Sequence, residues 1–195
     1  MLKKFTFKKG DIEYKLRNWF SNAQRIVIAG MGNPLRKDDS VGIRIVRNLR
    51  HRVPQAVFLI ECETVPERYI EEICEFKPTH ILIIDAVYFG LKPGSSDLID
   101  PNRVEMAFRA YDPYFTSVTH LATSQMPAIR THAMPLHIFC EALVKTTKAK
   151  LSLLAIQPQN TSIGEGISPE VEKSAEHLTD LLSRIMDQAL AGNRC

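Results

Sequence analysis

The feature that most constrains the fold is an apolar run that ends in a glycine turn and leads into a helical pattern. Residues Ile26–Ala29 are continuously apolar and largely β-branched, which is typical of a strand buried on both faces of a parallel sheet. Gly30 and Gly32 then permit turn conformations that are closed to residues with a Cβ, and Pro34 ends the strand. This strand, turn and helix predict an α/β fold.

Apolar strands and helical patterns continue to alternate along the chain. The patterns predict further strands at 56–60, 81–86, 97–99 and 151–156, and helices at 41–49, 66–74, 135–144 and from 168 onward, after an amphipathic stretch at 12–20. Residues 101–131 show no sustained period, and we expect a long loop or flap at 108–131. The expected architecture is a single three-layer α/β domain, a twisted and mostly parallel sheet with helices on both faces, with 1–24 as an N-terminal extension.

Composition narrows the class of protein. A chain of 195 residues with 45% hydrophobic content buries enough surface for one domain, and the net charge of +3 is spread too evenly to indicate a nucleic-acid partner. The four cysteines form no C-x-x-C pair, which argues against a zinc knuckle or a disulfide framework. No apolar run approaches the roughly 20 residues that span a bilayer, and no signal peptide is evident. We expect a cytoplasmic protein without a membrane partner.

Two carboxylates follow the glycine turn. Asp38 and Asp39 come just before the helical pattern that begins at Val41. An aspartate at a helix N-cap accepts a backbone N–H, which explains one of the two and leaves the other free. A dinucleotide-binding turn would need glycine where Leu35 stands, and two carboxylates would repel a pyrophosphate. The sequence therefore favours a cation over a phosphate here.

A third acid is expected at the same edge of the sheet. Asp85 ends the next buried apolar strand, and the carboxyl ends of parallel strands meet where an open α/β sheet binds its ligands. A buried carboxylate is costly unless it is paired, hydrogen-bonded or bound to metal. His132 precedes a helix led by proline, so its imidazole is the candidate third ligand, ahead of His120 and His137. Two oxygens and one imidazole leave open positions on a first-row metal.

Four segments, taken in order, resemble the hydrogenase maturation endopeptidases. They are the glycine turn with its two aspartates and Gly42, the Ile84-Asp85-Ala86 strand end, the Thr-His-Ala-Met-Pro-Leu stretch at 131–136, and Ile-Gln-Pro at 156–158. The last two look most like the members that serve formate hydrogenlyase-type hydrogenases. The resemblance runs from about Arg25 to the C-terminal helix, and residues 1–195 are expected to form one domain of this family.

The resemblance implies an endopeptidase with one protein substrate. Family members remove a C-terminal extension from the precursor of the [NiFe]-hydrogenase large subunit after nickel has been inserted. Carried over to this chain, Asp39, Asp85 and His132 are implied as catalytic and metal-binding residues, with Asp39 chosen because the family's ligand is the second acid of the pair. Asp38 is then expected to cap the helix rather than to act as a general base. The implied metal is nickel supplied by the precursor, which is also the implied partner.

The chain departs from the family at the turn, and other functions stay open. Lys37 and Ser40 stand where the family commonly has glycine, and Lys37 is expected to lower the pKa of a neighbouring carboxylate. One alternative is a non-proteolytic, nickel-dependent chaperone or scaffold in hydrogenase assembly, and a weaker one is a nucleotide-binding module. In a purely structural interpretation the three proposed ligands serve in capping and packing, and their substitution lowers stability.

Overall fold

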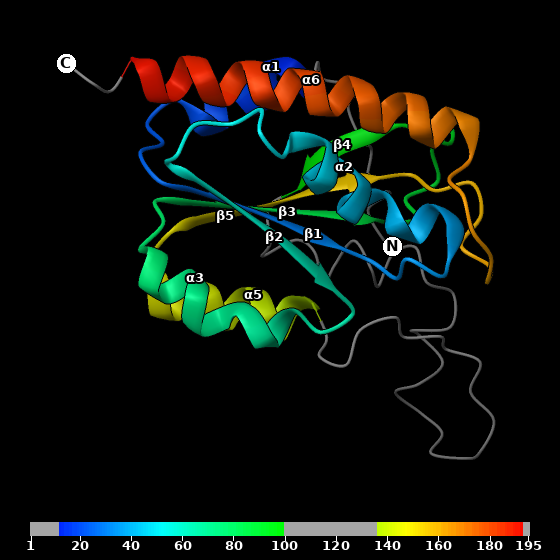
Figure 1. The fold of residues 1–195 in the computed structure, drawn as a ribbon, viewed down its shortest axis with the longest axis horizontal. Coiled ribbons are helices and arrows are strands. Elements are labelled where there is room, and N and C mark those ends of the chain that lie inside the picture. The colour runs from blue at the N-terminus through cyan, green and yellow to red at the C-terminus, as the bar shows by residue number, and fades with distance from the viewer. Residues whose placement is uncertain (1–11, 100–135, 193–195) are drawn as a thin grey trace, which may run out of the picture.

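A five-stranded sheet lies between two layers of helices (Figure 1). The computed structural model describes residues 12–99 and 136–192. In chain order its elements are α1 (Ile12–Phe20), β1 (Ile26–Met31), η1 (Lys37–Ser40), α2 (Val41–Leu49), β2 (Val57–Glu63), η2 (Pro66–Tyr69), α3 (Ile70–Phe76), β3 (His80–Ala86), β4 (Ser96–Ile99), α5 (Leu136–Thr147), β5 (Lys150–Ile156) and α6 (Pro169–Ala191), where η denotes a short 3-10 helix. Helices α1, α2 and α6 cover one face of the sheet, and α3 and α5 cover the other.

The strand order of the sheet is β2-β1-β3-β5-β4. The pairs β1–β2, β1–β3 and β3–β5 are parallel, and among the described strands only the edge strand β4 runs antiparallel to its neighbour. Because β2 lies on one side of β1 and β3 on the other, the chain changes direction across the sheet between β1 and β3. Such a switch point leaves a crevice at the carboxyl ends of the two strands. The expected α/β architecture is confirmed.

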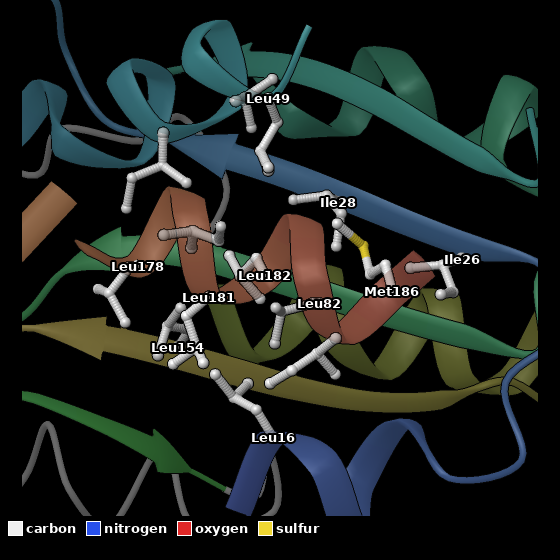
Figure 2. Packing of buried hydrophobic residues seen from close by; sticks show 14 of the residues in the cluster. Leu16, Ile26, Ile28, Leu49, Leu82, Leu154, Leu178, Leu181, Leu182 and Met186 are labelled. Carbon is white, nitrogen blue, oxygen red and sulfur yellow. The ribbon is translucent and has the colours of Figure 1, made fainter. Parts of the chain in front are cut away.

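The strands predicted as continuous apolar runs are buried on both faces. On the side of α6, Ile28 and Leu82 belong to one core cluster with Leu182 and Met186 (Figure 2). The alternate residues of β1, such as Val27, face a second cluster built around helices α3 and α5. Side chains alternate across a strand, so a strand covered on both sides must be apolar at every position. This explains why periodicity of two is absent from the sequence.

The other predicted elements are found close to their expected positions. The amphipathic stretch forms α1, the short strand near Asp97 is β4, and the helix expected to open at Ser168-Pro169 is α6. The flap expected at 108–131 lies outside the described residues. None of the helices in the described ranges combines the length and apolar character needed to cross a membrane.

His80 is a buried histidine at the start of β3, remote from the carboxyl ends of the strands. Its ring makes an edge contact with Trp19, at 4.9 Å between centroids, and its Nδ1 lies 3.0 Å from Oγ1 of Thr79. Burial, with a smaller contribution from the charge of Lys150, lowers the pKa of His80 to about 4. The imidazole is neutral at pH 7 and serves the packing of α1 on the sheet.

Acid is expected to destabilise the protein through His80. The unfolded chain takes up this proton near the ordinary pKa of 6.5 and the folded chain only near 4, so the free energy of unfolding falls as the pH falls between these values. The loss is on the order of 3 kcal/mol. Urea unfolding of the wild type and of His80→Phe across this window measures it, because the difference between the two proteins cancels other titrations. Parallel pH profiles would contradict the prediction.

Candidate active site

The beginning of α2 approaches the ends of β1 and β3 more closely than side chains would allow. A Cβ built at Gly42 would lie 2.2 Å from the carbonyl oxygen of Ile84. At Gly32, whose φ is +124°, a Cβ would lie 1.6 Å from the carbonyl oxygen of Asp39. Glycine is therefore required at both positions. The two glycines let η1, which carries Asp39, rest directly against the ends of the two strands.

Asp39 and Asp85 form a buried acid pair at the switch point. The two residues are 6% and 4% exposed. Oδ2 of Asp39 accepts a hydrogen bond from the backbone N–H of Asn33 at 2.9 Å, and Oδ1 of Asp85 accepts one from the N–H of Ala86 at 2.8 Å. The two acids predicted from separate segments are thus brought to one edge of the sheet.

The electrostatics of the pair favour a proton or a cation. Burial raises the pKa of Asp39, while the bond from Asn33 and the charge of Arg36 oppose that rise. Burial raises the pKa of Asp85 well above its usual range, and the nearby charge of Asp39 raises it further. Two carboxylates in this position do not both ionise readily, and a bound cation relieves both the desolvation and the repulsion.

The turn around Lys37 shows why glycine suits this position. Lys37 has a φ of +41°, in the left-handed region that favours glycine, and its N–H donates to the carbonyl of Gly164 at 3.0 Å. The positive charge that opposes the rise in the pKa of Asp39 comes from Arg36, not from Lys37. The role expected of Lys37 therefore belongs to its neighbour.

His132, the third proposed ligand, lies outside the described residues, as does His120. Across 12–99 and 136–192, no group of three or more His, Cys, Asp or Glu residues is placed to hold a metal ion. Burial raises the pKa of the Cys62 and Cys140 thiols to about 12. Neither thiol is a nucleophile at neutral pH, because the thiolate is the reactive form.

The prediction that Asp38 caps α2 is wrong. The turn η1 runs directly into α2, so the backbone N–H of Val41 is already bonded to the carbonyl of Asp38, and no side chain caps the helix. The Asp38 carboxylate is fully buried and accepts four hydrogen bonds from a segment distant in sequence. The donors are the N–H groups of Gln159 and Asn160 at 2.8 Å, the N–H of Ser168 at 2.6 Å and the Ser168 hydroxyl at 2.8 Å.

Gln157 is a structural residue to which the sequence analysis assigned no role. Its side chain is buried at the end of β5, and its Oε1 accepts hydrogen bonds from the N–H groups of Phe89 at 2.9 Å and Leu91 at 3.3 Å. The amide Nε2 donates to the carbonyl of Pro158 at 3.0 Å. A buried amide must find such partners, so a glutamine directly after an apolar strand is the signal that was available.

Residues 157–168, which we call the β5–α6 connection, therefore join the two segments that carry the acid pair. At one end Gln157 holds the segment that follows Asp85, and along its length the connection bonds to Asp38, the neighbour of Asp39. Figure 1 shows this connection beside the start of α2, at the end of the sheet where the parallel strands terminate. The position of each acid thus depends on the same connection.

Comparison with known proteins places this architecture in a family. The family model described as hydrogenase maturation protease matches residues 43–123. A Methanocaldococcus jannaschii protein with the provisional name of hydrogenase maturation protease is 29% identical over 86% of this chain and 91% of its own length. The Hydrogenase 3 maturation protease of Escherichia coli K12 is 28% identical over 68% of this chain and 72% of its own.

A solved structure agrees with these relatives. The [NiFe] hydrogenase maturation protease HycI from Thermococcus kodakarensis KOD1 superimposes with a TM-score of 0.72 at 29% identity, covering 89% of this chain and 99% of that protein. The fold, the matching segments and the relatives lead to one conclusion. The family model, the relatives and the solved structure all indicate the hydrogenase maturation protease family, whose named members are peptide hydrolases.

Proposed function

We propose that this protein removes the C-terminal extension from the precursor of a [NiFe]-hydrogenase large subunit after nickel insertion. We further propose that it recognises the bound nickel through Asp39, Asp85 and His132. The observation that carries the proposal is the buried acid pair at the switch point of the sheet. The names of the relatives, Hydrogenase 3 maturation protease and [NiFe] hydrogenase maturation protease, support the class of substrate.

The donor set suits a divalent metal carried by the substrate. Two carboxylates that resist ionising together are stabilised by a cation between them, and an imidazole from His132 completes a set of oxygen and nitrogen donors that nickel accepts. In this proposal the nickel belongs to the precursor. The protein recognises a finished metal centre by completing the coordination of its nickel. A precursor without nickel cannot make this contact.

The chemical work is hydrolysis of one peptide bond. Water adds to the scissile carbonyl carbon, the C–N bond breaks, and the leaving nitrogen takes up a proton. The contribution of Asp39 and Asp85 is to hold the metal-bearing part of the precursor in one orientation, which fixes the scissile bond relative to the attacking water. Their rigid placement by η1 and β3 meets that requirement.

Intact mass spectrometry of the cognate precursor tests the proposal. After incubation with this protein, the nickel-loaded precursor is expected to lose a C-terminal peptide, whereas the nickel-free precursor keeps its full mass. Cleavage of both forms would contradict recognition of nickel. An unchanged mass together with a stable complex would instead support the non-proteolytic chaperone or scaffold.

A further inference from the structure

Three segments around the acid pair expose large apolar side chains. Leu35 is 64% exposed and Ile163 is 82% exposed, and Tyr88 and Leu91 are about half exposed. We call these four residues the apolar rim. Leu35 precedes η1, Tyr88 and Leu91 follow β3, and Ile163 lies in the β5–α6 connection. Single exposed hydrophobic residues are common, but four on the segments that surround one site are typical of a contact surface.

The backbone beneath the rim is ordered by hydrogen bonds. Gly164 donates its N–H to the carbonyl of Leu35 at 2.9 Å, and Lys37 donates to Gly164 at 3.0 Å, which forms a parallel bridge between Arg36 and Gly164. Leu35 and Ile163 each precede a bridge partner, so they lie at the same level of the bridge. The apolar side chains are therefore presented by a fixed backbone.

Tyr88 and Leu91, the remaining residues of the rim, are hydrogen-bonded to the β5–α6 connection. The hydroxyl of Tyr88 lies 3.2 Å from Oγ1 of Thr161, within the β5–α6 connection. Oε1 of Gln157 accepts a hydrogen bond from the N–H of Leu91. A contact surface that is ordered before binding loses less conformational entropy when its partner arrives. The rim has this property on all three of its segments.

The position of the rim indicates what covers it. Leu35 stands four residues before Asp39, and Tyr88 stands three residues after Asp85. An extended peptide advances about 3.3 Å per residue, so a substrate whose scissile bond reaches the acid pair passes over these segments within a few residues.

We propose that the apolar rim binds an apolar segment of the hydrogenase precursor close to the scissile bond. The inference rests on the proposed function and adds a second element of recognition to it. The acid pair contacts the metal centre, and the rim contacts the polypeptide beside it. The rim then contributes to affinity for the precursor, whereas the acids act on the cleavage step.

Charged substitutions in the rim test this inference. Leu35→Asp and Ile163→Asp are expected to raise KM for the nickel-loaded precursor by about 10- to 100-fold, because each places a charge in an apolar contact, and to leave kcat and the thermal midpoint unchanged. Val144→Asp is the matched control, since Val144 is an exposed aliphatic residue of α5, outside the rim. The readouts are cleavage kinetics by mass spectrometry, precursor binding, and thermal unfolding of each full-length variant.

The outcomes separate the two proposals. If the wild type binds or cleaves the nickel-loaded precursor and the rim variants do so equally well, the rim inference alone fails. If the wild type neither binds nor cleaves it, the proposed function fails and the rim inference fails with it. A lower thermal midpoint in the rim variants would show that the chain itself covers the rim. A change from dimer to monomer would show that a second copy does, and either result would overturn the inference.

Discussion

Asp39→Asn and Asp85→Asn are each expected to abolish cleavage of the nickel-loaded precursor without destabilising the folded protein. The expected loss of kcat/KM is at least about 10²-fold, because a substrate displaced by about 1 Å from its reactive orientation loses that much rate. Each asparagine keeps an oxygen that accepts the bond from Asn33 or Ala86. Because neither variant adds a buried charge to the pair, the free energy of unfolding stays the same or increases.

The pH dependence of stability provides a second readout for the same variants. A carboxyl group whose folded pKa is raised stabilises the protein below its unfolded pKa, and this stabilisation is lost as the pH rises through the folded pKa. The pKa of Asp85 is raised by burial and by Asp39, so the wild type loses stability with rising pH in that window, and Asp85→Asn loses less because only Asp39 still titrates there. If unfolding of the variants accounted for their whole loss of cleavage activity, the acid pair would be structural.

The control for these variants is an aspartate of similar charge but different surroundings. Asp180 lies on α6, is largely exposed, and pairs with Arg52 at 2.6 Å. Asp180→Asn is expected to retain wild-type kinetics, and exposed ion pairs contribute at most about 1 kcal/mol. If this control lost activity as severely as Asp39→Asn, the effect would reflect net charge rather than the acid pair.

Asp38→Ala is expected to lower the free energy of unfolding by about 3–5 kcal/mol, because its removal leaves four donors without their acceptor. Cleavage is expected to fall with it, since the β5–α6 connection no longer holds η1 beside β3. Urea unfolding and precursor cleavage, measured on the same preparation, check both effects. The variant tests whether Asp38 anchors the β5–α6 connection.

Two milder variants define the anchor more closely. Asp38→Asn keeps one side-chain oxygen, which can accept the three hydrogen bonds now made to Oδ2. Its decrease in the free energy of unfolding is therefore expected to be less than half of that in Asp38→Ala. Ser168→Ala removes only the hydroxyl donor and is expected to cost about 1 kcal/mol. Wild-type stability in Asp38→Ala would contradict the assignment of Asp38 as the anchor of the β5–α6 connection.

The sequence predicted the elements that depend on local pattern. Strand β1 was recognisable because burial on both faces demands continuous apolar residues, and the location of Asp39 and Asp85 at one edge followed from strand direction alone. The C-terminal end of strand β2 was harder to predict. The strand continues beyond Ile60 to Glu63, because Glu61 and Glu63 pair with the end of β1, which a local pattern does not reveal.

The bonds that organise the site were beyond sequence reasoning for a physical reason. Asp38 before a helical pattern matched a local rule, but its actual donors follow β5, far along the chain. Gln157 likewise bonds to Phe89 and Leu91 from another segment. No periodicity or spacing specifies which distant backbone groups will meet a buried polar side chain. Such contacts are set by the packed sheet.

The separation of these partners along the chain has a consequence for folding. The hydrogen bonds that Asp38 accepts from Gln159, Asn160 and Ser168 join residues 121, 122 and 130 positions apart in the sequence. Contacts between such distant residues carry a large entropic cost and form late, after local structure has assembled. A partly folded chain therefore carries both Asp39 and Asp85 but no working peptidase, so hydrolytic activity appears only in the finished molecule.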